Sequence, residues 1–252
     1  MNFTRLLELI GDEPVFNSAV LLAGPVNPAD LCRQLSRWTK AGRLIQLRRR
    51  VYTLAPPYQK IKPHPFLIAN RLLPASYVSL QSALDYYGLI PDVVHGVTSV
   101  TTRRPHRWQT PLGSFIFHHI KPTWLHGYRR LEVSPGQYAF VATPEKALLD
   151  LAYLHPRADD PAFLQELRLQ NLERLDLAQL RALADRSAKP KLRRFAERVA
   201  ELEMETYELL RRTICESCCA ARSPQLMGGI SSVSIYKPAS WRSYNAPARC
   251  SR

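Results

Sequence analysis

The sequence predicts an α+β fold, in which a small helical part with a basic hairpin precedes a larger part of strands and helices. Apolar residues repeat at helical spacing over the first forty residues, and this spacing returns after residue 143. Between residues 97 and 141, four runs of β-branched and aromatic residues alternate with Pro and Gly. We therefore expect two domains, the second a mixed α/β domain with a small antiparallel sheet and C-terminal helices.

Two short helices are expected at the N-terminus. The first ends at Gly11, and its apolar face consists of Phe3, Leu6, Leu7 and Ile10. Asn17 can cap the second helix, which turns Val20 and Leu21 inward and ends at Gly24.

A longer helix is predicted over residues 28–41. Asn27 is a favoured N-cap, Pro28 fits the first turn because its missing N–H costs nothing there, and Gly42 ends the helix. The apolar face carries Leu31, Leu35 and Trp38. The opposite face, about 200° round the helix, carries Arg33, Arg37 and Lys40. The pattern therefore predicts one buried side and one cationic side.

A basic hairpin follows this helix. Residues 43–47 and 51–54 are strand-like, and Arg48, Arg49 and Arg50 form the turn between them. Three short helices and a hairpin of this kind are typical of a winged helix-turn-helix, which we expect over residues 1–57. Residues 58–65, rich in Pro and Lys, are expected to form a stiff linker.

The second domain is expected over residues 66–211. A helix over 68–73 and another capped by Ser76 precede the strands, which are predicted at 97–102, 115–120, 128–133 and 138–141. Thr143 caps the next helix, and further helices begin near Pro161, Asp176 and Pro190. Residues 212–252 lack a helical or strand period, and we expect a disordered tail there.

Positive charge is concentrated at the two ends of the chain, whose net charge is +14. Residues 1–62 hold ten Lys or Arg against four Asp or Glu, and residues 212–252 hold six against one. From Leu31 to Leu84 there is no Asp or Glu, whereas an ordinary solvated surface mixes both signs. This pattern favours binding to a nucleic acid over simple solvation.

Duplex DNA fits the basic stretch better than RNA. A helix fits the major groove, and a basic hairpin beside it can follow the phosphates. The stretch shows no set of aromatic residues that could stack on unpaired bases. We expect DNA contacts from nine residues, which are Arg33, Gln34, Ser36, Arg37, Lys40, Arg43, Arg48, Arg49 and Arg50.

Composition also limits the class of protein. There is no run of about 18 apolar residues and no signal-peptide pattern, so we expect a cytoplasmic protein without membrane contact. Five cysteines do not make a disulfide framework, and Cys215, Cys218 and Cys219 lack a fourth zinc ligand at regular spacing. His118 and His119 would point to opposite faces of a strand. We therefore expect neither a metal nor another cofactor.

An enzymatic alternative is a metal-dependent nuclease built on Asp92, Glu132 and the pair Glu145-Lys146. The spacing is unfavourable, because Ser134 stands where a lysine would follow Glu132, and Glu145 opens a helix. No phosphate-cradling glycine loop or Ser/His/Asp order is present, and we expect no enzymatic activity. A third alternative is a winged helix that docks a protein, which the salt dependence of DNA affinity would distinguish.

Four runs in the second domain are distinctive together: Tyr77-Val78-Ser79-Leu80-Gln81-Ser82-Ala83-Leu84, Gly88-Leu89-Ile90-Pro91, Thr98-Ser99-Val100-Thr101-Thr102-Arg103-Arg104-Pro105 and Thr143-Pro144-Glu145-Lys146-Ala147-Leu148-Leu149-Asp150. On the basis of these four runs, the chain resembles the AbiEi-class antitoxins of type IV toxin-antitoxin systems, and the resemblance covers about residues 1–210. The resemblance implies a winged helix that represses its own operon by binding double-stranded DNA, with inverted repeats in the promoter. It also implies an antitoxin domain that opposes a neighbouring nucleotidyltransferase toxin without a required stable complex.

The chain departs from this family at the hairpin turn. Family wings look like Arg-Gly-Val-Tyr, whereas this chain has Arg50-Val51-Tyr52. A glycine that would accept positive φ is replaced by arginine, so we expect a looser or strained turn.

Overall fold

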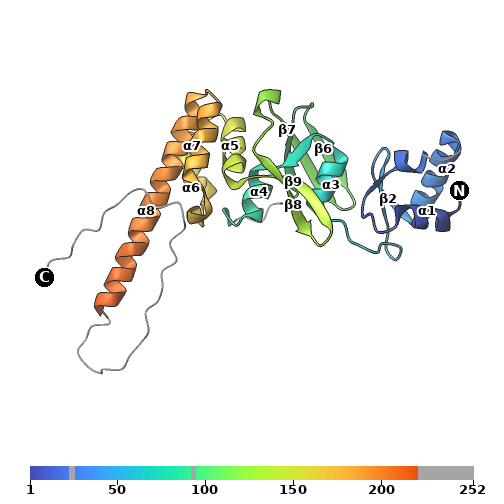
Figure 1. Ribbon diagram of the computed structural model, residues 1–252, viewed down its shortest axis with the longest axis horizontal. Helices are drawn as coiled ribbons and strands as arrows, with labels where there is room; N and C mark the ends of the chain where they lie inside the picture. The colour runs from blue at the N-terminus through green and yellow to red at the C-terminus, as the bar shows by residue number, and fades with distance from the viewer. Residues whose placement is uncertain (23–25, 92–94, 221–252) are drawn as a thin grey trace, which may run out of the picture. The chain divides into compact units, whose positions relative to one another are not determined.

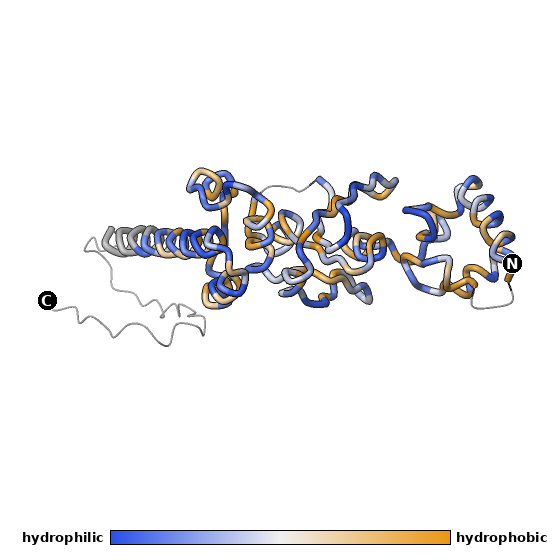
Figure 2. Tube along the Cα trace, turned by 90° about the horizontal axis from the view of Figure 1, so that it is seen from above, coloured by the Kyte–Doolittle hydropathy of each residue, from blue (hydrophilic) through white to orange (hydrophobic). Residues whose placement is uncertain are grey.

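The computed structural model describes residues 1–22, 26–91 and 95–220, and its helices and two sheets confirm the α+β prediction (Figure 1). The chain divides into two compact units, residues 1–198 and 199–252, and both sheets lie in the first. Apolar and polar stretches alternate along the helices and strands of this unit (Figure 2), as elements with one buried face require.

The N-terminal elements share one apolar core. They are α1 (Phe3–Ile10), β1 (Phe16–Asn17), η1 (Ser18–Leu22), α2 (Pro28–Lys40), β2 (Leu44–Arg48) and β3 (Val51–Leu54). Strand β3 lies between β1 and β2 in an antiparallel sheet. The core includes Leu6 and Ile10 of α1, Leu31 and Leu35 of α2, and Tyr52 of β3. The apolar faces predicted for both helices are therefore buried against the same sheet.

The ends of α1 and α2 follow the predicted caps. Gly11 ends α1 with φ +59°, a backbone conformation that suits glycine. The Asn27 side chain accepts a hydrogen bond from the Ala29 N–H at 2.9 Å, and Gly42 follows α2 with φ +68°.

The second predicted helix is only partly correct. Asn17 does accept a hydrogen bond from the Ala19 N–H at 2.9 Å, but it ends a strand, and the turn that follows is the 3-10 helix η1. Leu21 is buried as predicted, whereas Val20 is 65% exposed, because five residues of 3-10 helix do not repeat the α-helical spacing. The predicted end at Gly24 lies outside the described residues.

The β2–β3 hairpin agrees with the prediction and shows the expected strain. Its register shifts by one residue between Gln46 and Arg48, which marks a bulge in β2. Arg50 follows with φ +70°, in the left-handed region that glycine adopts more readily. The backbone therefore accommodates arginine in a conformation that glycine would adopt with less strain.

The second sheet has six strands in the order β6-β7-β5-β4-β9-β8. They are β4 (Ser76–Val78), β5 (Val97–Thr101), β6 (His106–Thr110), β7 (Gly113–His119), β8 (Tyr128–Ser134) and β9 (Gln137–Ala142). The helices are α3 (Pro65–Leu72), α4 (Leu80–Tyr86), η2 (Pro122–Trp124), α5 (Pro144–Leu154), α6 (Pro161–Leu167), η3 (Leu172–Arg174), α7 (Leu177–Arg186) and α8 (Pro190–Ala220). Helix α3 packs on β9 and β4, while α5 lies between α4 and α7 (Figure 1).

The small antiparallel sheet predicted for this region is wrong in two respects. The sheet is mixed, because β4 pairs in parallel with β9, and β5 with β7. Two of its strands were not predicted. Ser76, expected to cap a helix, begins β4, since Tyr77 and Val78 are buried and pair with β5, and the helix starts later with Ser79 as its N-cap. Strand β6 pairs with β7 and is mostly exposed, so its sequence lacks an apolar run.

Two boundaries also differ from the sequence predictions. The expected linker over residues 58–65 is held to the sheet, because the Gln137 side chain accepts from the His64 N–H at 2.8 Å and donates to the Lys62 carbonyl at 3.0 Å. Helix α8 continues through residues 212–220, where a disordered tail was expected. That segment contains no Pro or Gly to end a helix, and residues 221–252 lie outside the described part.

Candidate nucleic-acid interface

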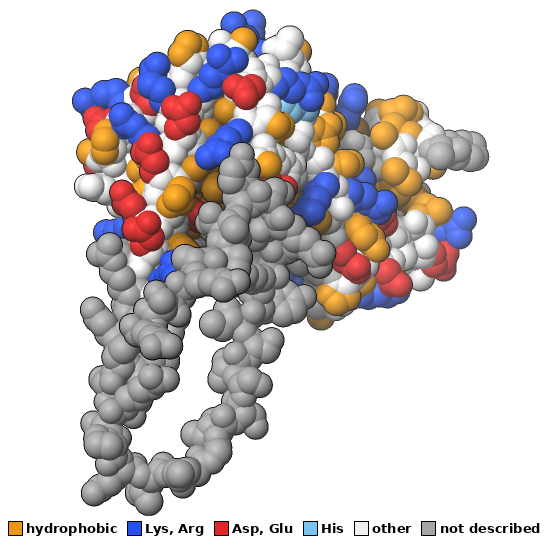
Figure 3. All heavy atoms as spheres, turned by 60° about the vertical axis from the view of Figure 1, so that its left-hand side comes forward, with side chains coloured by type: hydrophobic (Ala, Val, Ile, Leu, Met, Phe, Trp, Pro, Cys, Tyr) orange, Lys and Arg blue, Asp and Glu red, His pale blue; other side chains and the backbone are white. Residues whose placement is uncertain are grey.

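The exposed face of α2 carries the predicted cations. Leu31 and Leu35 fix the orientation of the helix, because both are buried in the N-terminal core. The residues that point the other way are exposed, and they are Arg33, Ser36, Arg37 and Lys40. By contrast, the foreground of Figure 3 shows Lys and Arg side by side with Asp and Glu, as on an ordinary solvated surface.

The cations of this face differ in what they contact. Arg33 forms an ion pair with Asp30, three residues before it on the same helix. The Arg43 guanidinium lies over the Phe3 ring, with its Cζ 5.2 Å from the ring centre. In the described part of the chain, no ion pair involves Arg37 or Lys40. These two side chains are therefore the ones most available to an anionic partner.

Gln34 lies apart from the other predicted contacts. It is half-buried, and its side-chain oxygen is buried without a hydrogen-bond partner among the described residues. Because it is one residue removed from Arg33 and Leu35, it sits on the flank of the helix between the buried and the cationic faces.

The hairpin turn adds a second basic feature. A hollow of about 430 Å³ is lined by Asn17, Arg48, Arg49 and Arg50. Arg49 and Arg50 are exposed at its rim. Three guanidinium groups around one open hollow suit an anion such as a phosphate group, to which arginine can donate two parallel hydrogen bonds.

Arg48 differs from its two neighbours because it contacts the second sheet. Its guanidinium Cζ lies 5.7 Å from the centre of the Trp108 ring on β6, and it is half-buried. Burial, followed by the positive charge of Arg103, lowers the pKa of Arg48. Trp108 is itself held, since its ring stacks on His106 at 5.0 Å and meets Phe117 at 5.2 Å. Trp108 was not predicted as a site residue, although the alternation of His106, Trp108 and Thr110 weakly indicates a strand.

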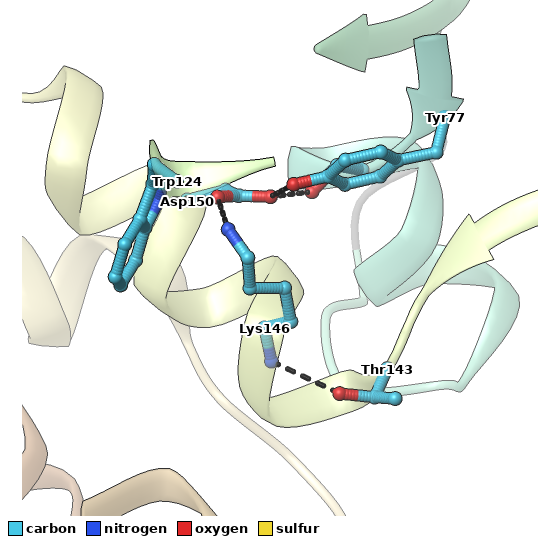
Figure 4. Close-up of polar contacts among 6 residues, drawn as sticks. Tyr77, Trp124, Thr143, Lys146 and Asp150 are labelled. Carbon is cyan, nitrogen blue, oxygen red and sulfur yellow. Dashed lines mark hydrogen bonds and ion pairs between the residues drawn. The ribbon is translucent and has the colours of Figure 1, made fainter. Parts of the chain in front are cut away.

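Helix α5 carries a buried ion pair that was not predicted. Lys146 and Asp150 lie one turn apart on α5, and both side chains are fully buried (Figure 4). The Asp150 carboxylate also accepts hydrogen bonds from three other groups, which are Tyr77 Oη at 3.0 Å, Ser79 Oγ at 2.7 Å and Trp124 Nε1 at 2.8 Å. Burial lowers the pKa of Lys146 and raises the pKa of Asp150, while the contact between the two groups opposes both changes.

This cluster holds elements together and is closed to a substrate. Four donors satisfy the Asp150 carboxylate, and they come from β4, the residue before α4, η2 and α5. Gly127 closes over the Lys146 side chain, where a Cβ atom would lie 3.0 Å from its carbons. Neither charged group has a surface exposed to solvent. The arrangement therefore has the character of a structural anchor.

The residues considered for a nuclease do not come together. Glu132 is exposed, and its carboxylate accepts from the Gly136 N–H at 2.8 Å. Glu145 is buried, and one of its oxygens accepts from the Asp176 N–H at 3.0 Å. Lys146 is engaged with Asp150, and Asp92 lies outside the described residues.

The residues considered for a metal are also dispersed. Within residues 1–22, 26–91 and 95–220, no group of three or more His, Cys, Asp or Glu side chains could hold a metal ion. His119 contacts the Arg103 carbonyl oxygen at 3.0 Å, and burial lowers the pKa of the half-buried His118. The Cys215, Cys218 and Cys219 side chains are outside the described part of the structure.

Neither a protein-family model nor a curated protein matches this sequence. Among solved structures, the chain is similar to the RV2827C protein of Mycobacterium tuberculosis, known from a crystal structure. The TM-score is 0.48 and the sequence identity 18%, and the match covers 79% of this chain and 75% of that chain. None of the described helices is both long and apolar enough to cross a membrane.

Proposed function

We propose that this chain is a DNA-binding transcriptional repressor that autoregulates its operon and also acts as a type IV antitoxin. In this proposal the N-terminal elements form a winged helix-turn-helix, with α2 as the recognition helix and the β2–β3 hairpin as the wing. The observation that carries the proposal is the outward face of α2, where Arg37 and Lys40 are exposed opposite the buried Leu31 and Leu35.

The two basic features suit different parts of duplex DNA. Arginine on an exposed helix can donate two hydrogen bonds to a guanine edge in the major groove. Arg49 and Arg50 at the wing turn can bind the backbone phosphates, which fix orientation without reading sequence. The expected partner is double-stranded DNA upstream of the gene itself, with inverted repeats as the operator. No membrane partner and no cofactor belong to this proposal.

The antitoxin half of the proposal rests on the sequence resemblance. We expect the second domain to oppose a nucleotidyltransferase toxin without a required stable complex. Two of the four resembling runs supply Tyr77, Ser79, Lys146 and Asp150 of the buried anchor. These residues support the frame of the antitoxin domain, so the residues that protect against a toxin should be sought on its surface.

The proposal is tested by replacing Arg33, Arg37 and Lys40 together with alanine. The variant should lose specific binding to the upstream DNA and keep its melting temperature, because these side chains lie off the buried face of α2. A matched control removes three exposed arginines elsewhere, Arg157, Arg181 and Arg186, and changes the net charge equally. Gel-shift affinities of the two variants separate a specific surface from total charge.

Unchanged operator affinity in the α2 variant would overturn the assignment of the recognition helix. A salt titration addresses the alternative of a protein-docking module. A plot of the logarithm of the duplex affinity against the logarithm of the salt concentration should be a falling line. Its slope should be about −0.9 for each phosphate that the protein neutralises. A flat salt dependence would favour protein docking.

A further inference from the structure

Three exposed aromatic rings lie together on the β8–β9 hairpin. Tyr128, Tyr138 and Phe140 are 40%, 41% and 45% exposed. The residues that alternate with them on β9, Gln137, Ala139 and Val141, are buried. Large aromatic side chains in the outward positions of a strand expose apolar area that a solvated hairpin does not require. We call Tyr128, Tyr138 and Phe140 the aromatic platform.

The register of the two strands places the platform on one face. Arg130 is opposite Phe140, Glu132 is opposite Tyr138, and Tyr128 is opposite Ala142. Residues opposite one another share a face, as do residues two apart on one strand. Strand geometry separates Tyr138 from Phe140 by about 7 Å along β9. The rings are therefore neighbouring stacking positions on one exposed face of the hairpin.

The rings are held in place before any ligand arrives. Tyr128 stacks on the buried Tyr77 with 4.6 Å between ring centres, and it meets Phe140 edge-on at 5.8 Å. The Arg130 guanidinium lies over Tyr138, with its Cζ 4.1 Å from the ring centre. Rings that are already ordered lose little conformational entropy on binding a flat ligand.

A hollow of about 650 Å³ adjoins the platform. Tyr138 and Phe140 line it together with two cations, Arg71 of α3 and Arg130 of β8. Two carboxylates are close to these groups, and each is engaged. Glu13 forms an ion pair with Arg71 at 3.5 Å, and Glu132 accepts the Gly136 N–H. Arg130 has no ion pair among the described residues, so it can meet an anion beside the rings.

We propose that the aromatic platform and Arg130 bind unpaired nucleotides of a single-stranded nucleic acid. Bases stack on exposed aromatic rings and on arginine planes, and an adjacent cation binds the phosphate between two bases. A protein partner would also use aromatic and arginine side chains, but separate flat rings along an open strand face with one unpaired cation match a chain of bases and phosphates better. This site uses elements other than α2 and the wing, so it is independent of duplex recognition.

The test measures binding of the full chain to three fluorescent decamers by anisotropy. One is thymidine DNA, one is uridine RNA, and one is an abasic strand with the same phosphates but without bases. The thymidine and uridine strands should bind at least about tenfold more tightly than the abasic strand, because stacking on each ring contributes on the order of a factor of ten. Equal affinity for all three would show that only charge is involved and would overturn the proposal.

Variants locate the site. Replacing Tyr138 and Phe140 together with leucine should abolish the preference for strands with bases, whereas Phe140→Tyr should keep it. Tyr86 of α4 is 43% exposed and outside the platform, so Tyr86→Leu is the matched control. If the double variant melts early, Arg130→Gln provides a second test, because it removes the cation and leaves the rings. It should weaken binding of all three strands and keep the base preference. Base preference that survives in a folded double variant, or unchanged affinity of all three strands in Arg130→Gln, would overturn the proposal.

The same measurements keep this proposal separate from the repressor proposal. The platform variants should bind the duplex operator normally. The α2 variant should bind single strands with its base preference intact. If an isolated partner protein binds the platform while single strands do not, the surface is a protein-docking site and the nucleic-acid proposal is wrong.

Discussion

Arg50 occupies a backbone conformation that is costly for any residue with a Cβ atom. Its φ of +70° lies in the left-handed region, which costs a non-glycine residue about 1–2 kcal/mol. The hairpin keeps this conformation because β2 and β3 pair on either side of it, and because the Arg50 carbonyl accepts a hydrogen bond from the Ser18 N–H at 2.8 Å. Arginine at position 50 therefore adds a third guanidinium group to the turn but lowers the stability of the folded protein.

Replacing Arg50 with glycine should therefore raise the free energy of unfolding by about 1 kcal/mol, since glycine removes the strain but adds freedom to the unfolded chain. Arg49→Gly is the matched control, because it removes the same charge at a residue that is not in the left-handed region. Urea denaturation measures both. A similar loss of stability in the two variants would mean that the turn is not strained.

His126 gives the protein a predictable response to acid. Burial, followed by the positive charges of Lys146 and Arg186, lowers its pKa to about 4 from an ordinary value near 6.5. Both ring nitrogens are buried without a partner in the described structure. Between pH 6.5 and 4 the unfolded chain binds a proton at this site and the folded chain does not, so stability is lost as the pH falls through this window.

The substitution His126→Gln tests this statement, because glutamine cannot take up the proton. The melting temperature of the natural protein should drop between pH 7 and pH 5, and the drop should be smaller in the variant. Differential scanning calorimetry at the two pH values gives the comparison. An equal drop in both proteins would place the acid sensitivity elsewhere, for instance at His64 or His118, whose pKa values burial also lowers.

At the level of elements, β2 contacts β6, and Arg48 and Trp108 take part in this contact. The contact between Arg48 and Trp108 withdraws one of the three turn arginines from solvent. A guanidinium that lies over an indole and is partly desolvated is less available to a phosphate than an exposed one. In the proposed repressor, strand β6 would therefore reduce the number of phosphate contacts that the wing can make.

This leads to a prediction on the salt dependence of duplex binding. Arg49→Gln should reduce the slope of logarithmic affinity against logarithmic salt by about 0.9, whereas Arg48→Gln should leave it unchanged. Trp108→Leu should steepen the slope by about the same amount, because it frees Arg48, and the double variant with Arg48→Gln should lose that gain. If Arg48→Gln alone flattens the slope, Arg48 already contacts DNA and Trp108 does not restrain it.

Elements with a clear period and a cap could be predicted from the sequence. Helix α5 begins where Thr143 caps it, with its side chain accepting from the Lys146 N–H, and α2 exposes the cations that its spacing indicated. Strand β4 could not be separated from a helix start, because three residues carry no period and their pairing partners β5 and β9 are distant in sequence. The position of Arg48 was likewise inaccessible, since it depends on Trp108 in a strand that the pattern did not indicate.

At the level of the whole molecule, the two proposed functions belong to different parts of unit 1–198. A fragment starting at Pro63 should fold, because the six-stranded sheet and its helices have their own buried core, and it should bind duplex DNA poorly without α2 and the wing. It should still relieve growth arrest when the neighbouring toxin is induced. Co-expression in cells, with the fragment of residues 1–62 as control, measures both. Rescue by the small fragment alone would mean that protection acts through repression.

The pairing of β4 with β9 also determines when each part of the chain can fold during synthesis. Val78 pairs with Val141, so the centre of the large sheet cannot close until the ribosome has released the chain beyond Ala142. The N-terminal sheet closes with β3, which ends at Leu54. Because contacts between near neighbours form faster than distant ones, the α2 surface should be complete on the nascent chain well before the second sheet. In the proposed repressor, the surface assigned to DNA binding would therefore form before the part assigned to the antitoxin function.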